Sequence, residues 1–486
     1  MSYDPRSSHL FVLIHGLWGT PEHMESLRQS FKAAMDPREN AVFLLPSRNA
    51  KFKTFDGIEI LGYRVLLEVC QFIQQYNEDN KDGRQIRRIS IIGYSLGGLV
   101  ARFVVGKMFT ECREYFRGIE PALFLTMATP HIGIKFFNPQ HSLWRSITNP
   151  VLTFLGSNAL GKSGRELFIT NSYNDTLVRL SSGEFTEGLA RFQRRVVCAN
   201  VKNDRTVAFY TAFVSEYDPF IDTQNRLNYT FEQGVPGTGY SGILPRIVDM
   251  DKLDPADMRV VVRRPRTLKQ KLVLYVMIPC LLVVFFPIAL IVNISGTIYR
   301  HVATSRYRRM IRDGDLPSEF RERIGISSRL TRYVSETYES IVKESDDPNA
   351  ARNNDVGDDD DDDDDDDNLS MGLGQHIHDD KASIVAAEQL EEEKWNTFID
   401  KYSSVMDPRR DWLGRFKKLP FDEKRKLIVR NLSELEWIRV PLYVKSINSH
   451  GGIVARRGMN EDAPPTSIAA VEFVGKLVSH LVSSMH

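Results

Sequence analysis

The clearest chemical signal in this chain is a serine, Ser95, with a glycine two positions away on either side, Gly93 and Gly97. An apolar run precedes these residues and a helical pattern follows them, which is the strand–turn–helix context of a nucleophile elbow. A serine at the tip of such a turn has a strained backbone, and the glycines leave room for it. The pattern predicts that Ser95 is a catalytic nucleophile. A glycine-rich turn without catalytic function remains the alternative.

A serine nucleophile requires an orienting acid and a general base, which follow the serine in that order in this fold class. Asp204 lies just after an apolar strand expected at 195–201, where the acid should lie. We therefore predict Asp204 to be the acid, although an Asx-turn role stays open. Asp218 and Asp222 are weaker candidates, because they lie in a longer polar loop away from a strand end.

The predicted base is His450, a few residues after the last expected strand, 442–444. Gly451 and Gly452 follow it and allow the loop to fold back toward Ser95. The other histidines after the acid lie in an acidic tract, in the terminal helix or tail, or after an apolar segment; these are His376, His378, His480, His486 and His301. A surface-loop role for His450 is the alternative.

Two backbone N–H groups must stabilise the oxyanion of an acyl-transfer intermediate. One is expected from Leu96, the residue after the nucleophile. The other is expected from Leu17, in the loop after the first strand. His15 begins that loop and is expected to be structural, not the general base.

Apolar runs alternate with helical patterns along the chain, which is typical of an α/β protein with a mostly parallel sheet. Strands are expected at 10–14, 41–45, 89–92, 123–127, 195–201 and 442–444. Helices are expected at 22–34, 58–72, 99–105 and 468–482. An irregular apolar stretch near 134–170 fits either a packed helix pair or a lid over an acyl-chain pocket.

The composition excludes some classes of protein. Lys and Arg together number 63 among 486 residues, as do Asp and Glu, so the balance does not indicate a nucleic-acid partner. The four cysteines form no spacing motif, so we expect a reduced compartment without a disulfide framework or metal site. We expect no cofactor, and the polar N-terminus does not resemble a secretory signal.

Residues 272–299 carry no charged side chain, and 272–292 are nearly continuously apolar, long enough to cross a bilayer once. A single crossing would separate Asp204 from His450, and 28 residues are too few for two helical crossings. We therefore expect a hairpin, broken at a proline, that enters one leaflet. Basic flanks on both sides agree with this topology. A buried core helix is the alternative.

The ten consecutive aspartates Asp358–Asp367 lie in a polar stretch, 346–381, with few apolar residues. Charge repulsion and the lack of core-forming side chains predict a disordered linker. A site for calcium or for a basic partner is the alternative.

Five motifs together resemble the serine esterase family of lipase-like α/β hydrolases, and within it the fungal lipid-droplet phospholipases. They are His15-Gly16-Leu17-Trp18-Gly19, Gly93-Tyr94-Ser95-Leu96-Gly97-Gly98, Ala128-Thr129-Pro130-His131-Ile132-Gly133, Asn203-Asp204-Arg205-Thr206-Val207 and Ser449-His450-Gly451. The resemblance covers about 1–215 and 435–486. It implies an α/β-hydrolase fold and a Ser-Asp-His lipase that acts on glycerophospholipids at the droplet surface, facing the cytosol. The endoplasmic reticulum membrane is the alternative location.

Four segments are expected: a hydrolase domain at 1–260, a basic-flanked hairpin at 261–312, an insertion at 313–434, and the return of the hydrolase domain at 435–486. A triacylglycerol or sterol-ester lipase or an acyl-protein thioesterase would use the same elbow. A membrane-anchored scaffold without catalysis is the alternative from another functional class. A transmembrane protein with only its N-terminal half in the cytosol also stays open.

Overall fold

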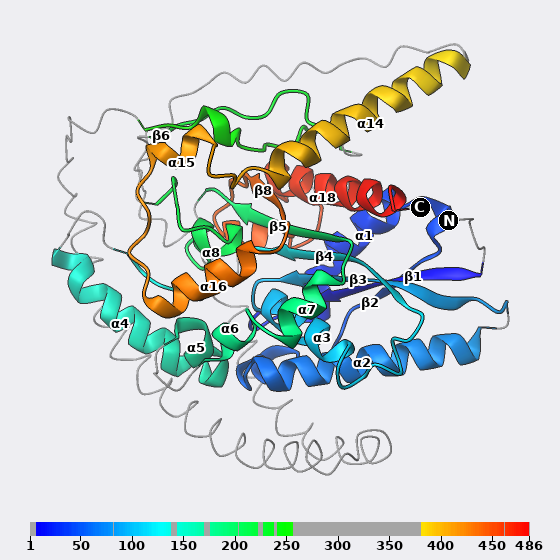
Figure 1. Ribbon diagram of the computed structural model, residues 1–486, viewed down its shortest axis with the longest axis horizontal. Helices are drawn as coiled ribbons and strands as arrows, with labels where there is room; N and C mark the ends of the chain where they lie inside the picture. Colours follow the sequence, from blue (N-terminus) through cyan, green and yellow to red (C-terminus); the bar gives the residue numbers. More distant parts are fainter. Residues whose placement is uncertain are drawn as a thin grey trace, which may run out of the picture. The chain divides into compact units, whose positions relative to one another are not determined.

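The computed structural model describes residues 6–80, 82–137, 143–169, 175–202, 204–221, 227–237, 241–255, 381–460 and 462–485 (Figure 1). The apolar segment 272–299 and the aspartate run lie outside these ranges, so the hairpin and the disordered linker stay predictions. Within the described ranges, no helix combines the length and the apolar character needed to cross a membrane.

A six-stranded sheet forms the centre of the fold, in the order β2-β1-β3-β4-β5-β8. Its strands are β1 (Ser7–Ile14), β2 (Ala41–Leu44), β3 (Gln85–Tyr94), β4 (Glu120–Met127), β5 (Arg194–Asn200) and β8 (Ile438–Leu442). Every neighbouring pair in it is parallel. The predicted α/β class is confirmed, with the mostly parallel sheet of an α/β hydrolase.

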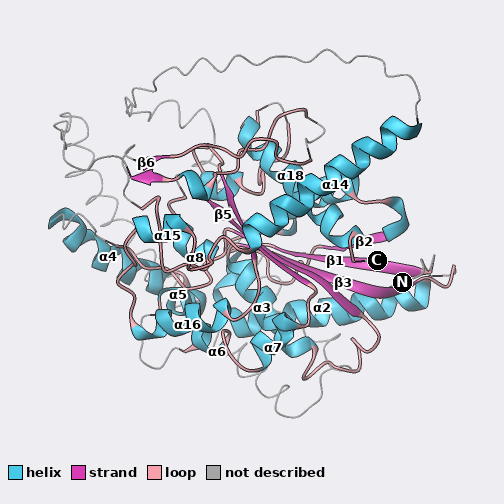
Figure 2. Cartoon of the chain, turned by 45° about the horizontal axis from the view of Figure 1, so that its top comes forward, coloured by secondary structure: helices cyan, strands magenta, loops and turns pink. Residues whose placement is uncertain are grey.

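Helices cover both faces of the sheet, because successive side chains of a strand point to opposite faces. In β1, Phe11 and Leu13 belong to one apolar cluster, while Leu10 and Val12 belong to another. The first cluster includes residues of α1 (Glu25–Ala34) and α18 (Pro465–Ser483). The second includes residues of α2 (Ile58–Asp79) and α3 (Leu96–Met108). Figure 2 shows the strands running through the interior between these helices.

Further helices and two short strands lie outside this sheet and the four helices named above. The helices are α4 (Leu143–Ala159), α5 (Gly161–Phe168), α6 (Thr176–Arg179), α7 (Glu184–Ala190), α8 (Phe209–Phe213), α14 (Lys381–Ser403), α15 (Asp411–Arg415), α16 (Glu423–Ser433) and α17 (Ser449–Gly452). The 3-10 helices are η1 (Pro21–Met24), η2 (Pro37–Glu39), η3 (Lys51–Phe55) and η4 (Met250–Lys252). Two two-residue strands, β6 (Leu227–Asn228) and β7 (Asp254–Pro255), pair with each other.

The last strand of the sheet begins earlier than the sequence suggested. The prediction placed it at 442–444, but β8 ends at Leu442 and contains Arg439 and Pro441. A charged residue and a proline argue against a central strand. Here β8 pairs only with β5 in the sheet, and Arg439 is buried with its Nε donating to the Phe213 carbonyl.

One compact unit comprises residues 1–260, 293–305 and 393–486, and the other comprises 261–292 and 306–392. The first unit therefore includes 393–434, which the sequence analysis assigned to an insertion. Residues 393–434 join the first unit because they contribute large buried side chains to it. Trp395, Tyr402 and Trp412 belong to the same core cluster as residues of α1 and α18. Of the second unit the structure describes only 381–392.

Candidate active site

Ser95 occupies the turn between β3 and α3 in a strained conformation, with φ 54° and ψ −126°. Such positive φ values cost free energy in a non-glycine residue, on the order of 1–3 kcal/mol. The flanking glycines permit the turn. A Cβ on Gly97 would overlap the carbonyl oxygen of Ile14, and one on Gly93 would overlap the backbone of Gly98.

The structure brings the predicted nucleophile, base and acid into one hydrogen-bonded chain. His450 Nε2 lies 2.9 Å from Ser95 Oγ, and His450 Nδ1 lies 2.9 Å from Asp204 Oδ2. Because a carboxylate only accepts hydrogen bonds, Nδ1 carries the proton and Nε2 presents its lone pair to the serine hydroxyl. The Asp204 side chain is 2% exposed and that of His450 is 13% exposed.

The backbone beyond β5 holds Asp204 in place. Its second oxygen, Oδ1, accepts hydrogen bonds from the N–H groups of Thr206 at 3.0 Å and Val207 at 2.8 Å. This is the Asx-turn geometry that the sequence left open as an alternative role. The structure combines the two roles, since Oδ1 binds the turn and Oδ2 faces His450.

Two side chains that the sequence analysis missed hold the segment that carries His450. His450 is the second residue of the short helix α17, and the N-cap residue Asn448 accepts a hydrogen bond from the Gly451 N–H. Tyr94 Oη donates to the His450 carbonyl at 3.0 Å, and the two rings lie 5.2 Å apart. Burial raises the pKa of Tyr94, which keeps its hydroxyl protonated. The only available signal was the position of Tyr94 directly before the nucleophile.

The loop after β1 approaches the nucleophile closely. A Cβ on Gly16 would lie 2.7 Å from Ser95 Cβ, so only glycine fits there. In the described part of the chain, neither the Leu17 N–H nor the Leu96 N–H has a hydrogen-bond acceptor. The Trp18 N–H donates to Thr54 Oγ1 at 3.0 Å and fixes the loop from the other side. Two donors therefore remain available beside Ser95.

The buried side chain of His15 packs against this loop. It is 5% exposed, and its Nδ1 lies 3.0 Å from the Gly16 carbonyl oxygen. A Cβ on Gly19 would lie 2.6 Å from the same nitrogen. Burial lowers the pKa of His15, so the ring stays neutral. Its hydrogen bond is to the loop, while Ser95 is bonded to His450.

The rival acids lie elsewhere. Asp218 is buried, and its carboxylate accepts hydrogen bonds from the N–H groups of Tyr210 and Phe220. Burial raises its pKa to about 7. Asp222 lies outside the described residues. Across the ranges given above, no group of three or more His, Cys, Asp or Glu side chains has metal-binding geometry.

The parallel sheet and the strand–turn–helix elbow at Ser95 are those of the α/β-hydrolase fold. Residues 4–217 match the model of a family described as "Putative serine esterase (DUF676)". The matched residues include Ser95 and Asp204, whereas His450 lies beyond them.

Relatives from yeasts carry lipase names. The chain is 30% identical over 212 residues to "Putative lipase ROG1" of Saccharomyces cerevisiae and 32% identical over 213 residues to "Putative lipase YDL109C" of the same species. Each match covers 43% of this chain, but only 28% and 30% of the respective relatives. The chain thus matches less than a third of the length of either protein.

Proposed function

We propose that this protein is a serine-dependent lipid acyl hydrolase in which Ser95, His450 and Asp204 form the catalytic triad. The observation that carries the proposal is the chain of two 2.9 Å hydrogen bonds from Ser95 Oγ through the imidazole to Asp204. A nucleophile, a base and an orienting acid in this order define the geometry of acyl transfer.

In the acylation step, His450 Nε2 takes the proton of Ser95 as Oγ attacks the carbonyl carbon of an ester. Asp204 stabilises the imidazolium that forms and holds its orientation. The negative charge that develops on the carbonyl oxygen is stabilised by the N–H groups of Leu17 and Leu96. Collapse of the intermediate breaks the ester bond, and His450 gives its proton to the leaving alcohol.

In the deacylation step, water attacks the acyl-serine ester. His450 removes a proton from that water and returns a proton to Ser95 Oγ as the fatty acid leaves. Both steps use the same two backbone donors, which need no rearrangement between them.

The proposed substrates are glycerophospholipids at the surface of a lipid droplet, with the endoplasmic reticulum membrane as the alternative location. The support is the resemblance of the five motifs to the droplet phospholipases. A second candidate, hydrolysis of triacylglycerols or sterol esters, is favoured by the lipase names of the yeast relatives. An acyl-protein thioesterase would use the same triad and differ only in its binding surface.

A scaffold without catalysis has less support. The strained conformation of Ser95 and the close approach of Gly16 cost stability and serve no purpose in a scaffold. The basic-flanked segment 272–299 is proposed to anchor the enzyme in one leaflet, which keeps both parts of the triad on the same side of the lipid surface.

The test is fatty-acid release from a panel of phospholipids, triacylglycerols and sterol esters by the purified full chain and its Ser95→Ala variant. Release from phospholipids that disappears in Ser95→Ala supports the phospholipase. Ser95-dependent release only from neutral lipids moves the assignment to the second candidate. Release that persists in Ser95→Ala overturns the mechanism. Deleting 272–299 should free the protein from droplets, and retention there would contradict the anchor.

A further inference from the structure

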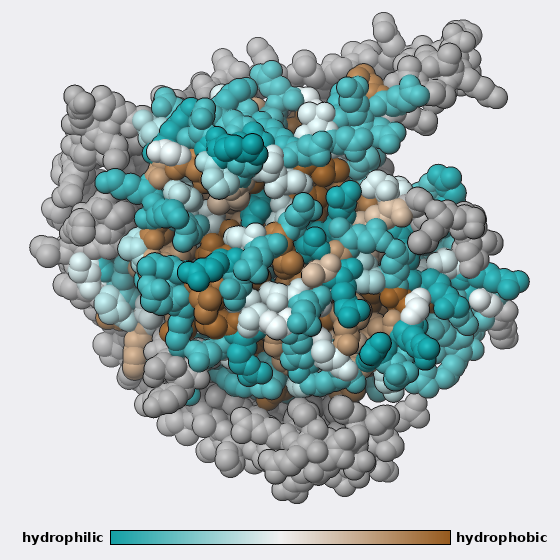
Figure 3. Space-filling model, viewed as in Figure 1, coloured by the Kyte–Doolittle hydropathy of each residue, from teal (hydrophilic) through white to brown (hydrophobic). Residues whose placement is uncertain are grey.

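Helix α4 exposes large apolar side chains to solvent. Val151, Leu152 and Phe154 are 42%, 47% and 57% exposed, and we call these three residues the α4 apolar patch. They lie within a single turn of the helix. The face in Figure 3 is mostly hydrophilic, with apolar residues scattered among the polar ones. Neighbouring exposed apolar residues on one helix typically mark a binding surface.

The segment that contains this patch has more cations than acids. Between residues 134 and 174 the sequence has four cations, Lys135, Arg145, Lys162 and Arg165, and a single acid, Glu166. That acid is buried and accepts a hydrogen bond from the Ile58 N–H. Lys162 Nζ lies 3.7 Å from both Glu166 and Glu59, so its charge is offset. Exposed apolar side chains on α4 together with the cation Arg165 on α5 are the combination that binds anionic lipid surfaces.

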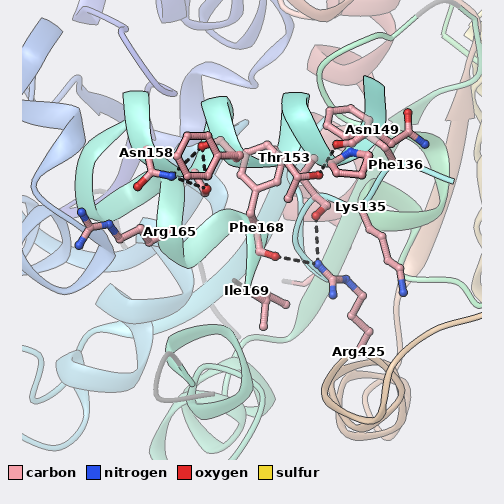
Figure 4. A pocket seen from close by; sticks show the side chains of 13 residues that line it. Lys135, Phe136, Asn149, Thr153, Asn158, Arg165, Phe168, Ile169 and Arg425 are labelled. Atoms are coloured by element: carbon pink, nitrogen blue, oxygen red, sulfur yellow. Dashed lines mark hydrogen bonds between the residues drawn. The ribbon is translucent and has the colours of Figure 1, made fainter. Parts of the chain in front are cut away.

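A groove of about 770 Å³ lies between α4, α5 and the loop after β4. Figure 4 shows the Phe168 ring in its middle, Arg165 at one end, and Phe136 and Lys135 toward the other end. The groove has the size of a small-molecule site. Its aromatic centre suits an acyl chain, and its ends suit an anion.

The polar side chains on the α4 wall are already engaged within the helix. Thr153 Oγ1 donates to the Asn149 carbonyl, while Ser157 Oγ and Asn158 Nδ2 donate to the Phe154 carbonyl. These bonds satisfy the donors locally. The wall can therefore receive a hydrocarbon chain without leaving these donors unpaired.

Arg425 of α16 closes the groove and is 5% exposed. Its guanidinium donates to the carbonyls of Ile134 and Phe168 and pairs with Asp422. Lys135 Nζ also lies 3.4 Å from that carboxylate, so one acid offsets two cations. Arg165 has no ion-pair partner among the described residues, which leaves its charge available.

We propose that the groove and the α4 apolar patch dock this protein on an anionic phospholipid surface, with an acyl chain of one lipid in the groove and its phosphate at Arg165. The proposal rests on the proposed function, since it names the surface on which the hydrolase works. A second copy of this chain is the other occupant that the apolar patch would fit.

The test is co-sedimentation of the full-length protein with vesicles of ether-linked phosphatidylcholine, with or without ether-linked phosphatidylglycerol, whose chains a hydrolase cannot release. Because 272–299 could bind vesicles by itself, the readout is the ratio of partition coefficients on anionic and neutral vesicles. Phe154→Asp and Arg165→Glu should each lower this ratio about fivefold or more, because each change adds negative charge to the docking surface.

Matched controls are Leu244→Asp, at a residue 66% exposed on another loop, and Arg194→Glu, at the start of β5. Both should bind as the wild type does, and unfolding midpoints confirm that all variants fold. Equal binding by test and control variants would overturn the proposal. So would a dimer in solution that Phe154→Asp dissociates. Hydrolysis of a soluble short-chain ester by wild type and Ser95→Ala tests the proposed function separately, because it needs no surface.

Discussion

Ser95 Oγ and His450 Nε2 lie 2.9 Å apart although 355 positions separate the two residues in the sequence. The sheet explains this proximity. β8 pairs in parallel with β5, with Leu442 opposite Asn200, so the loops after both strands leave the same edge. Asp204 follows β5 and His450 follows β8, which places acid and base together. The chain between Asp204 and His450 must therefore return to the same edge of the sheet.

Asp204→Asn tests the orienting role of the acid. An amide can donate to Nδ1 and so favours the tautomer that presents a proton, not a lone pair, to Ser95. We expect kcat on a soluble ester to fall about 10³–10⁴-fold, with KM little changed. Steady-state kinetics measures both. A loss of less than about tenfold would show that Asp204 does not orient His450.

Tyr94→Phe removes the hydrogen bond to the His450 carbonyl but keeps the ring packing. The free energy of unfolding should fall by about 1 kcal/mol, and kcat should fall severalfold because the imidazole is less well held. Tyr115→Phe, at a residue 43% exposed, is the control and should match the wild type. If Tyr94→Phe kept full kcat, the hydroxyl would have no positioning role.

Gly97→Ala tests the packing of the elbow against β1. The new methyl group would overlap the carbonyl oxygen of Ile14, a backbone atom that cannot move aside. Urea denaturation should show a loss of several kcal/mol in the free energy of unfolding. Gly414→Ala is the matched control in α15, where a Cβ meets nothing within 4 Å. It should be as stable as the wild type or slightly more so. Equal effects of the two changes would contradict this account of the elbow.

Asp218→Asn tests the buried carboxyl group. Burial raises the pKa of Asp218 from 3.8 to about 7, so the folded protein binds this proton more tightly than the unfolded chain does. The resulting stabilisation is fully present below the unfolded value and is lost as the pH rises through about 7.

The free energy of unfolding of the wild type, relative to Asp218→Asn, should therefore fall by on the order of 2–4 kcal/mol between about pH 4 and pH 8. Denaturation of both proteins across this range measures the difference, with Asp82→Asn as an exposed control. A difference that does not change with pH would show that the carboxyl group is charged throughout.

Much of the sheet was predictable from the sequence, because buried parallel strands are short, continuous apolar runs. The run at 123–127 lies within β4, and the run at 89–92 lies within β3. The prediction placed β8 several residues too late, because Arg439 and Pro441 interrupt its apolar pattern. The strand order was not predictable, since no local pattern states which strands pair.

Residues of the site that act through side-chain contacts were harder to predict. Gly93 and Gly97 identified the elbow through backbone sterics, which are local. Tyr94 and Asn448 act through hydrogen bonds to the His450 segment, which only the folded chain reveals. The burial of Trp395 and Trp412 in the core was missed, because their segment follows a polar, acidic tract.

The most direct test of the central claim is labelling of the full-length protein with a fluorophosphonate, followed by mass spectrometry of the intact chain and its peptides. The reagent phosphonylates a serine only where a base activates it, and it requires no knowledge of the natural lipid. We predict a single adduct on Ser95, absent in Ser95→Ala and formed at least about a hundredfold more slowly in His450→Ala. An unlabelled wild-type protein, or an adduct on another serine, would contradict the assignment of Ser95 as the nucleophile.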